Sequence, residues 1–403
     1  MGSVSPGWVG SSCGAHITVV YRRLLADRPF VIGVGAVALS AVALGMIPLS
    51  LILSPGESLA TGAVAAGAFG LANAVGVPVQ GAVMARVSAR WVVSIGAGVS
   101  SSFMLLVAAS PGSTAQPALL AGAGVSFPAL AAALRASIPR SFSEPAERSG
   151  AYALLSVAFQ AGLATGPVMA GLLVASAPRQ LDFVVVAAVI GAAGALLAVS
   201  MGTTTPTPPA RSSLPLAGAT PFVRIVSIGG LVSVATGSLT VIVPAVVEAA
   251  GRGELAGPVL ACLALGEAVG ALLFGARPVP SSRRAQLLTA LALTAGGYAT
   301  LVIVADRIVL LAALVFVVGG LSSPVAIVLS GALDVVVPPR FIASAYGVVV
   351  VAAVGGSALG TSVAGLIVGS GDGVAGAAAM AALAISIAGV LSVRHVERRT
   401  TSR

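Results

Sequence analysis

The sequence predicts an all-α polytopic membrane protein with twelve transmembrane helices in two related six-helix halves. Three observations predict this fold class: an extreme apolar composition, an alternation of arginine between successive loops, and a repeat inside the chain. Of the 403 residues, 57% are hydrophobic and only 8% are charged, with a mean hydropathy of +1.07. Soluble domains carry about 25% charged residues. A chain with so few charged residues cannot cover a globular surface in water, so its surroundings must be largely lipid.

Twelve apolar segments are long enough to cross a bilayer, for which a helix needs ~20 residues. They lie at about 30–53, 58–84, 91–110, 115–137, 150–176, 182–201, 222–249, 255–275, 286–305, 308–335, 344–370 and 374–393. The longest interruption, 202–221, contains TTTPTPPARSSLP, which suits a linker and not a membrane helix. We therefore predict an N-terminal bundle at 29–201 and a C-terminal bundle at 222–393, with tails at 1–28 and 394–403.

The arginines support this count and predict the orientation. All 21 basic residues are arginine, and eighteen of them fall on one side, in the two tails, in the loops on the same side as the tails, and at the adjoining ends of two apolar segments. The opposite loops hold only Arg179, Arg252 and Arg307. Cytoplasmic loops carry the excess of basic residues, and a missed helix would invert the alternation after it. We expect a bacterial inner-membrane protein with both termini and the linker in the cytoplasm.

An internal repeat relates the two halves. Residues 149–176 align without a gap on 343–370, with twelve identities in 28 positions. The shared glycines are Gly162, Gly166 and Gly171 in the first segment and Gly356, Gly360 and Gly365 in the second. The fifth helix thus matches the eleventh, as duplication of a six-helix unit requires. Transporters built from such parallel repeats hold their substrate near the middle of the membrane, between the halves.

A short motif follows the second apolar segment. Gly81, Arg86 and Arg90 stand there with the spacing of the pattern Gly-x-x-x-Asp-Arg-x-Gly-Arg-Arg/Lys. In this motif the chain resembles the major facilitator superfamily, and the resemblance extends over nearly the whole length. Ala85 replaces the acidic residue and Ser88 the second glycine. The chain therefore departs from the charge relay that the family uses as a conformational latch.

The fifth segment carries a second motif. Gly162-x-x-x-Gly166-Pro167-x-x-Ala170-Gly171 is similar to the Gly-x-x-x-Gly-Pro-x-x-Gly-Gly motif of the family's proton-coupled exporters. Looser matches around Arg135 and Arg148 resemble actinobacterial efflux-type members. The resemblance implies the major facilitator fold and secondary transport by alternating access.

The glycine stripe of the fifth and eleventh segments has two interpretations. Small residues four apart let two helices approach closely in lipid, which is ordinary packing. Alternatively, Pro167 bends the helix where the halves rock against one another. Because both related helices carry the stripe, we expect it to pack at or near the moving boundary between the halves.

Glu267 is the only acidic residue deep within a predicted span. Ionised against lipid it would cost on the order of 3 kcal/mol or more. A site that binds and releases a proton is therefore physically natural here. A fixed ion pair, or a carboxylate that orients its helix toward a cavity, is the structural alternative.

Three other polar residues are candidates for the substrate or proton site. Gln160 and Asn73 lie within the fifth and second segments, where such groups make interhelical hydrogen bonds or line a cavity. Arg135 lies near the inner end of the fourth segment. It either extends to the membrane interface, as long basic side chains do, or contacts the substrate.

Other classes of function lack their residues. The chain has no lysine for a nucleotide-binding loop, and no His, Cys and carboxylate cluster at metal-binding spacing. We therefore expect no enzyme activity, cofactor or metal. The net charge of +9 comes from arginines separated by apolar runs, which form no continuous basic face for nucleic acid.

The sequence therefore favours a monomeric secondary transporter that exports a small apolar or amphiphilic compound in exchange for protons. Uptake of a sugar or another nutrient is the alternative within the same fold, and would be expected to need more polar groups. A membrane sensor, or a subunit that requires a partner, is a further alternative because the Gly81 to Arg90 motif is incomplete.

Overall fold

The computed structural model describes residues 20–54, 58–176, 180–201, 220–275, 283–338, 341–370 and 373–393. These residues form helices and contain no strand, and twelve spans are long and apolar enough to cross a membrane. The predicted fold class is therefore confirmed. The predicted tails at 1–19 and 394–403, and the linker up to residue 219, lie outside the described residues.

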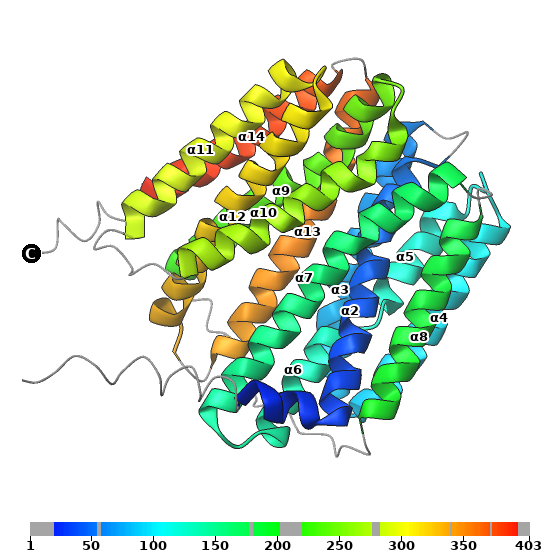
Figure 1. The fold of residues 1–403 in the computed structure, drawn as a ribbon, viewed down its shortest axis with the longest axis vertical. Coiled ribbons are helices and arrows are strands. Elements are labelled where there is room, and N and C mark those ends of the chain that lie inside the picture. Colours follow the sequence, from blue (N-terminus) through cyan, green and yellow to red (C-terminus); the bar gives the residue numbers. More distant parts are fainter. Residues whose placement is uncertain are drawn as a thin grey trace, which may run out of the picture.

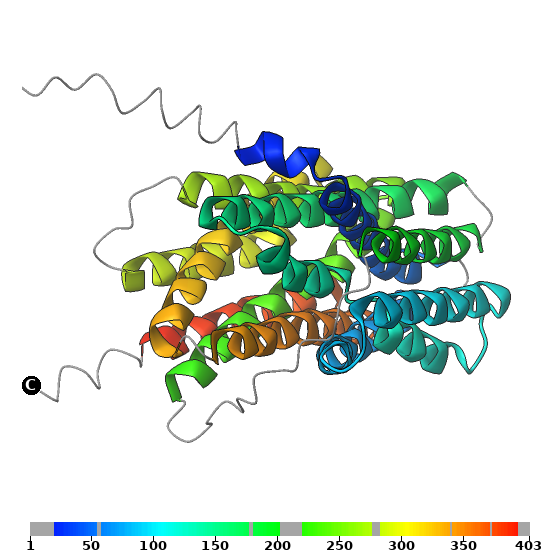
Figure 2. The same cartoon turned by 90° about the horizontal axis from the view of Figure 1, so that it is seen from below.

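The helices run roughly side by side in two bundles (Figure 1). The N-terminal bundle contains α2 (Arg28–Ile52), α3 (Leu59–Met84), α4 (Ala89–Ala109), α5 (Gln116–Ser126), α6 (Leu130–Ser141), α7 (Pro145–Ser176) and α8 (Leu181–Ser200). The C-terminal bundle contains α9 (Thr220–Ala249), η1 (Gly253–Leu255), α10 (Ala256–Gly275), α11 (Arg283–Val304), α12 (Ile308–Val336), α13 (Ile342–Gly369) and α14 (Gly373–Val393). Figure 2 shows the same helices from below.

Local signals fix where the helices begin, and lipid accounts for their outer faces. The Asp27 carboxylate caps α2 by accepting a hydrogen bond from the Phe30 N–H at 3.0 Å. The Ser58 hydroxyl caps α3 in the same way, at 3.1 Å from the Thr61 nitrogen. Large apolar side chains cover the outside, such as Ile303 and Val309, which are 78% and 82% exposed. Such a surface is stable against acyl chains and not against water.

The fourth span differs from the expected continuous helix at 115–137. It is broken after Ser126, and Gln80 of α3 holds the break. The Gln80 amide nitrogen donates to the carbonyls of Val125 and Phe127 at 3.1 and 2.8 Å, and its oxygen accepts from the Ala129 N–H at 3.1 Å. Pro128 has no N–H to continue the helix. One buried amide thus satisfies three backbone groups that lipid could not.

The internal repeat is visible in the helix contacts. Gly162 and Gly166 of α7 face the backbone of α2 at Ala38 and Val42. Their counterparts on α13 face the backbone of α9, Gly356 at Gly230 and Gly360 at Val234. The stripe therefore packs equivalent pairs of helices in the two halves, α7 on α2 and α13 on α9. The expectation that the stripe packs at the boundary between the halves was wrong for these four glycines, because their contacts lie inside a bundle.

Two other helix pairs form the boundary between the halves. On α7, the next glycine of the motif, Gly171, faces Gly257 of α10. Its counterpart on α13, Gly365, faces Ala63 of α3, and Gly369 faces Ala60. The halves thus meet through α7 with α10 and α3 with α13. The closest contacts lie near the end where α3 begins and α13 ends.

Candidate functional site

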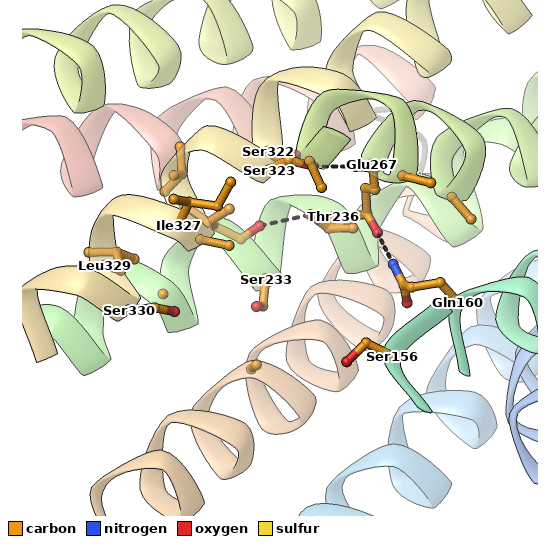
Figure 3. A pocket seen from close by; sticks show the side chains of 18 of the residues that line it. Ser156, Gln160, Ser233, Thr236, Glu267, Ser322, Ser323, Ile327, Leu329 and Ser330 are labelled. Atoms are coloured by element: carbon orange, nitrogen blue, oxygen red, sulfur yellow. Dashed lines mark hydrogen bonds between the residues drawn. The ribbon is translucent and has the colours of Figure 1, made fainter. Parts of the chain in front are cut away.

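A cavity of about 810 Å³ lies between the two halves. One helix of the N-terminal bundle, α7, faces four helices of the C-terminal bundle across it: α9, α10, α12 and α13. Most of the lining is aliphatic. The polar side chains in it are Ser156, Gln160, Ser233, Thr236, Glu267, Ser322, Ser323, Ser330, Tyr346 and Ser357. Figure 3 shows most of them around the cavity. A cavity of this size suits a drug-sized molecule.

The cavity extends toward one end of the molecule only. Its lining begins near the first turns of α9 and α13, at Ile225 and Tyr346, and reaches Leu333 near the end of α12. In the predicted orientation this is the cytoplasmic end. At the opposite end the small residues of α3, α7, α10 and α13 close the boundary. In that orientation, the structure is an inward-facing state.

Glu267 and Gln160 meet across the cavity. The Gln160 amide nitrogen on α7 donates a hydrogen bond to the Glu267 carboxyl oxygen on α10 at 3.3 Å (Figure 3). Both side chains are partly buried and both line the cavity. Two residues singled out from the sequence, 107 positions apart, thus form a polar contact between the two halves.

The backbone that carries Glu267 is fixed by close packing of α10 on α12. Gly266 and Gly270 face the α12 backbone at Phe316 and Gly320, and Gly319 faces the α10 backbone beside Glu267. The Ser323 hydroxyl donates to the Glu267 carbonyl oxygen at 2.5 Å. Small residues permit this approach because no Cβ stands between the two backbones. The carboxyl group therefore projects into the cavity from a rigid base.

A second polar group extends from the cavity lining into the C-terminal bundle. The Thr236 hydroxyl donates to the Val232 carbonyl at 3.1 Å and is hydrogen-bonded to Tyr298 of α11. Tyr298 is the largest of the fully buried side chains and interacts electrostatically with Glu267. The hydroxyl groups of Thr236 and Tyr298 thus form a hydrogen-bonded pair in the region of Glu267.

Asn73 is the structural counterpart of Glu267 in the N-terminal half. Gly124 faces the Phe69 carbonyl and the Asn73 nitrogen, whereas Gly319 faces the Leu263 carbonyl and the Glu267 nitrogen. The repeat therefore superposes position 73 on position 267. Asn73 nevertheless does not line the cavity, and its side chain is 4% exposed. Its amide oxygen has no hydrogen-bond partner among the described residues.

Arg135 and the motif between the second and third spans lie away from the cavity. Gly81, Arg86, Arg90 and Arg135 are exposed, and a Cβ at Gly81 would have no heavy atom of another element within 4 Å. Among the described residues, none of the three arginines has an ion pair or a hydrogen bond through its side chain. The latch that the motif resemblance suggests is therefore not formed in this conformation.

Sequence reasoning missed the hydroxyl groups of the site. Ser322 and Ser323 precede Pro324 in a strongly apolar span, and this pair was the available signal. Thr236 and Tyr298 had no comparable signal, because isolated hydroxyls are common in membrane helices. The described residues contain no cluster of His, Cys or carboxylate groups that would hold a metal ion.

Comparison with known proteins shows the family. A sequence profile of the Major Facilitator Superfamily matches residues 29–361. The chain belongs to the major facilitator superfamily. No curated protein sequence matches it significantly. Its superfamily membership and its twelve spans make it a multi-pass membrane protein of transporter type.

Solved structures of transporters share the fold at low sequence identity. The nucleoside transporter NupG superposes with a TM-score of 0.71 at 15% identity, over 91% of this chain and 96% of that one. A bacterial homologue of the human lysosomal transporter Spinster, in an inward-facing and occupied conformation, gives 0.66 at 14%, over 92% and 96%. A POT family transporter in complex with 5-aminolevulinic acid gives 0.68 at 11%, over 91% and 95%.

Proposed function

We propose that this protein exports a small apolar or amphiphilic compound across a bacterial inner membrane in exchange for protons. The observation that carries the proposal is the position of Glu267. It is the only charged side chain among the described lining residues of a cavity between two halves that belong to a transporter fold. A carboxyl group that contacts both the cavity and the opposite half can couple its protonation to movement of the halves.

The mechanism follows from alternating access. In the cytoplasm-facing state the compound enters the cavity and displaces the proton of Glu267. The halves then rock about the site, which closes the cytoplasmic end and opens the other. A proton from the more acidic exterior returns to Glu267 and the compound leaves. Gln160 hydrogen-bonds the carboxyl group from the opposite half, so movement of α7 relative to α10 alters this contact.

The lining favours an apolar or amphiphilic compound over a sugar. Aliphatic and alanine side chains such as Val157, Leu265 and Leu272 make up most of it, and Gln160 is the one amide. Sugars need many paired donors and acceptors, because each buried hydroxyl without a partner is costly. The resemblance of the Gly162 to Gly171 motif on α7 to that of proton-coupled exporters supports the outward direction. Nutrient uptake by the same fold is the second candidate, favoured only by the hydroxyl groups of the lining.

Two further features belong to this proposal. The arginine distribution supports cytoplasmic termini, and the chain is proposed to act as a monomer. A sensor or partner-dependent subunit is the remaining alternative, motivated by the replacement of the acidic motif residue by Ala85. If the purified chain alone transports a compound in proteoliposomes, the sensor or partner-dependent subunit is excluded.

Glu267→Gln tests the proposal, because the amide fills the same space and cannot carry a proton. Purified protein is placed in proteoliposomes with an imposed proton gradient, and a panel of amphiphilic dyes is screened for proton movement and dye accumulation. We expect the variant to express normally and to lose proton-driven accumulation completely. Glu248→Gln, on the exposed end of α9, is the matched control and should transport normally. Full accumulation by Glu267→Gln would remove Glu267 as the coupling site.

A further inference from the structure

We infer that the transported compound is a lipophilic monocation, and that one cation is exchanged for one proton at Glu267. The inference rests on the proposed proton coupling and adds the charge of the substrate and of the whole cycle. It predicts electroneutral transport, since the carboxyl group holds either a proton or the cation.

The charge balance of the cavity carries the argument. Glu267 is the sole ionisable carboxyl group of the described lining, and no described lining residue is basic. The only side-chain hydrogen bond described for its carboxyl group is the 3.3 Å contact from the neutral Gln160 amide. A carboxylate surrounded largely by apolar side chains is stabilised when an opposite charge pairs with it. Because the described lining offers no cation, the counter-charge must come from a proton or from the substrate.

An anionic or strongly polar compound fits this cavity poorly. An anion would meet the like charge of Glu267 and find no basic partner. A cation with a large apolar body fits both features, since the aliphatic walls cover the body and the carboxylate pairs with the charge. The cavity volume of about 810 Å³ is in the range that drug-sized ligands fill. The hydroxyls of Ser322 and Thr236 suit a few weak polar contacts.

Among the described residues, no second ionised side chain contributes to the charge balance of the cavity. On α7 the polar neighbour is Gln160, on α12 Ser323, and on α9 Thr236. Two titratable side chains approach from other helices, Tyr298 on α11 and Tyr346 on α13. Phenols are neutral across the physiological pH range. One carboxyl group therefore holds one positive charge, either the proton or the cation.

The exchange step conserves both protons and charge. Protonated Glu267 and a free monocation give ionised Glu267 paired with the cation, plus one proton released to the water-filled cavity. The reverse step, after the halves have moved, returns one proton and releases the cation. Each full cycle moves one positive charge in each direction, so the membrane potential does no net work on it.

A pair of probes with equal shape and opposite charge tests the charge preference. We propose to measure binding of radiolabelled tetraphenylphosphonium to the purified full-length protein in detergent, in competition with tetraphenylborate. The expected result is saturable binding of the cation, weakened as the pH falls, with about one proton released per cation bound in weakly buffered solution. Tetraphenylborate should not compete. Absence of cation binding, or equal binding of the anion, overturns the inference.

Variants locate the binding to Glu267. Glu267→Gln should weaken tetraphenylphosphonium binding by at least about 30-fold, because it leaves the cation without its counter-charge. Glu267→Asp keeps the charge and should retain binding within about 10-fold, which separates loss of charge from loss of folding. Glu248→Gln, outside the cavity, should bind like the original protein. Unchanged binding by Glu267→Gln overturns the assignment.

Transport measurements separate this inference from the proposed function. In proteoliposomes, ethidium movement should follow an imposed pH difference while valinomycin and potassium hold the membrane potential at zero. A potential imposed without a pH difference should drive none. If the potential alone drives ethidium, or if only neutral dyes move with protons, the one-for-one cation exchange is overturned while proton-coupled transport stands. If no gradient of protons moves any compound, the proposed function itself fails.

Discussion

Asn73 and Glu267 occupy equivalent positions with different surroundings. Glu267 faces an open cavity and Gln160, whereas Asn73 is buried and its amide oxygen has no partner in the part of the chain that the structure describes. Phe127 follows Gly124 by three residues, as Ser322 follows Gly319, so it lies in the corresponding region of the N-terminal half. Phe127 packs edge to face on Phe69, with ring centroids 5.8 Å apart. Bulky rings thus fill the N-terminal counterpart of the site, which explains why the cavity lies mainly in the C-terminal half.

We predict that Asn73→Leu leaves the protein at least as stable and reduces transport several-fold. Leucine has the same branching and the same number of side-chain heavy atoms, and a buried polar group without a partner costs about 1–3 kcal/mol. We expect transport to fall because the amide forms a hydrogen bond in another conformation of the transport cycle, and leucine cannot replace that bond. Thermal unfolding in detergent should show an equal or higher midpoint, and dye transport should fall. A lowered midpoint would show that the amide is bonded in the folded state, and unchanged transport that no conformation needs it.

Sequence reasoning identified Glu267 and Gln160 as candidates, but neither their contact nor the hydroxyl groups around them. Glu267 is recognisable because a carboxylate within an apolar span is expensive, and this cost does not depend on the fold. Its contact with Gln160 joins residues 107 positions apart, and no local pattern fixes that pairing. The serines of α12 and the tyrosine of α11 become part of the site only when the helices are packed.

At the scale of helices, the glycine stripe of α7 shows both the strength and the limit of the repeat. The repeat correctly indicated that α7 and α13 are equivalent. The repeat could not indicate which helix the stripe packs against, because a stripe of small residues allows close helix packing equally well inside a half or between halves. Likewise, the break between α5 and α6 depends on Gln80, 45 to 49 positions away from the atoms that it bonds. Pro324 of α12 stands at a similar place without breaking its helix.

We predict that Gly166→Leu destabilises the N-terminal bundle. A Cβ at Gly166 would lie 2.5 Å from the Val42 carbonyl oxygen and 2.7 Å from the Gly45 Cα. Both are backbone atoms of α2 that cannot move aside alone, so overpacking should cost about 1–3 kcal/mol. Expression and the unfolding midpoint in detergent should both fall, and Gly166→Ala should have a smaller effect.

The matched control is Gly98→Leu. Gly98 is an exposed glycine of α4 in the same bundle, and a Cβ there would have no heavy atom of another element within 4 Å. This variant should express and unfold like the original protein. If Gly166→Leu is as stable as Gly98→Leu, the α2 and α7 contact is looser than the structure shows.

At the scale of the whole molecule, the arginine distribution predicts which end of the cavity meets the cytoplasm. Reporter fusions can test this with three sites on each side. Fusions after Arg90, Arg211 and Arg284 should report the cytoplasm, and fusions after Ser113, Arg252 and Asp306 the exterior. A common location for Arg90 and Ser113, which lie at opposite ends of the third span, would contradict the orientation. The cavity would then have to be assigned to the other side.

The last prediction concerns the movement of one half against the other. The boundary helices α3 and α13 are in close contact toward the end away from the cavity mouth, where Gly365 faces Ala63 and Gly369 faces Ala60. They are also in contact at the level of the site, where a Cβ at Gly355 would lie 3.8 Å from that of Ala74. If the halves rock about the site, the pairs toward that end must separate in each cycle while the pair at the level of the site stays close.

Two engineered disulfides between these helices distinguish the ends from the pivot. Cysteines at positions 74 and 355 meet the Cβ separation of about 3.5–4.5 Å that a disulfide needs. Cysteines at positions 60 and 369 reach it with a shift of roughly 1 Å at two helix ends, since a Cβ at Gly369 would lie 2.6 Å from that of Ala60. Cys13 and Cys262 are first replaced by alanine. We expect oxidation of the 60 and 369 pair to stop transport, with recovery on reduction, whereas the oxidised 74 and 355 pair should keep most of it. The opposite result would place the pivot at the closed end and contradict rocking about the site.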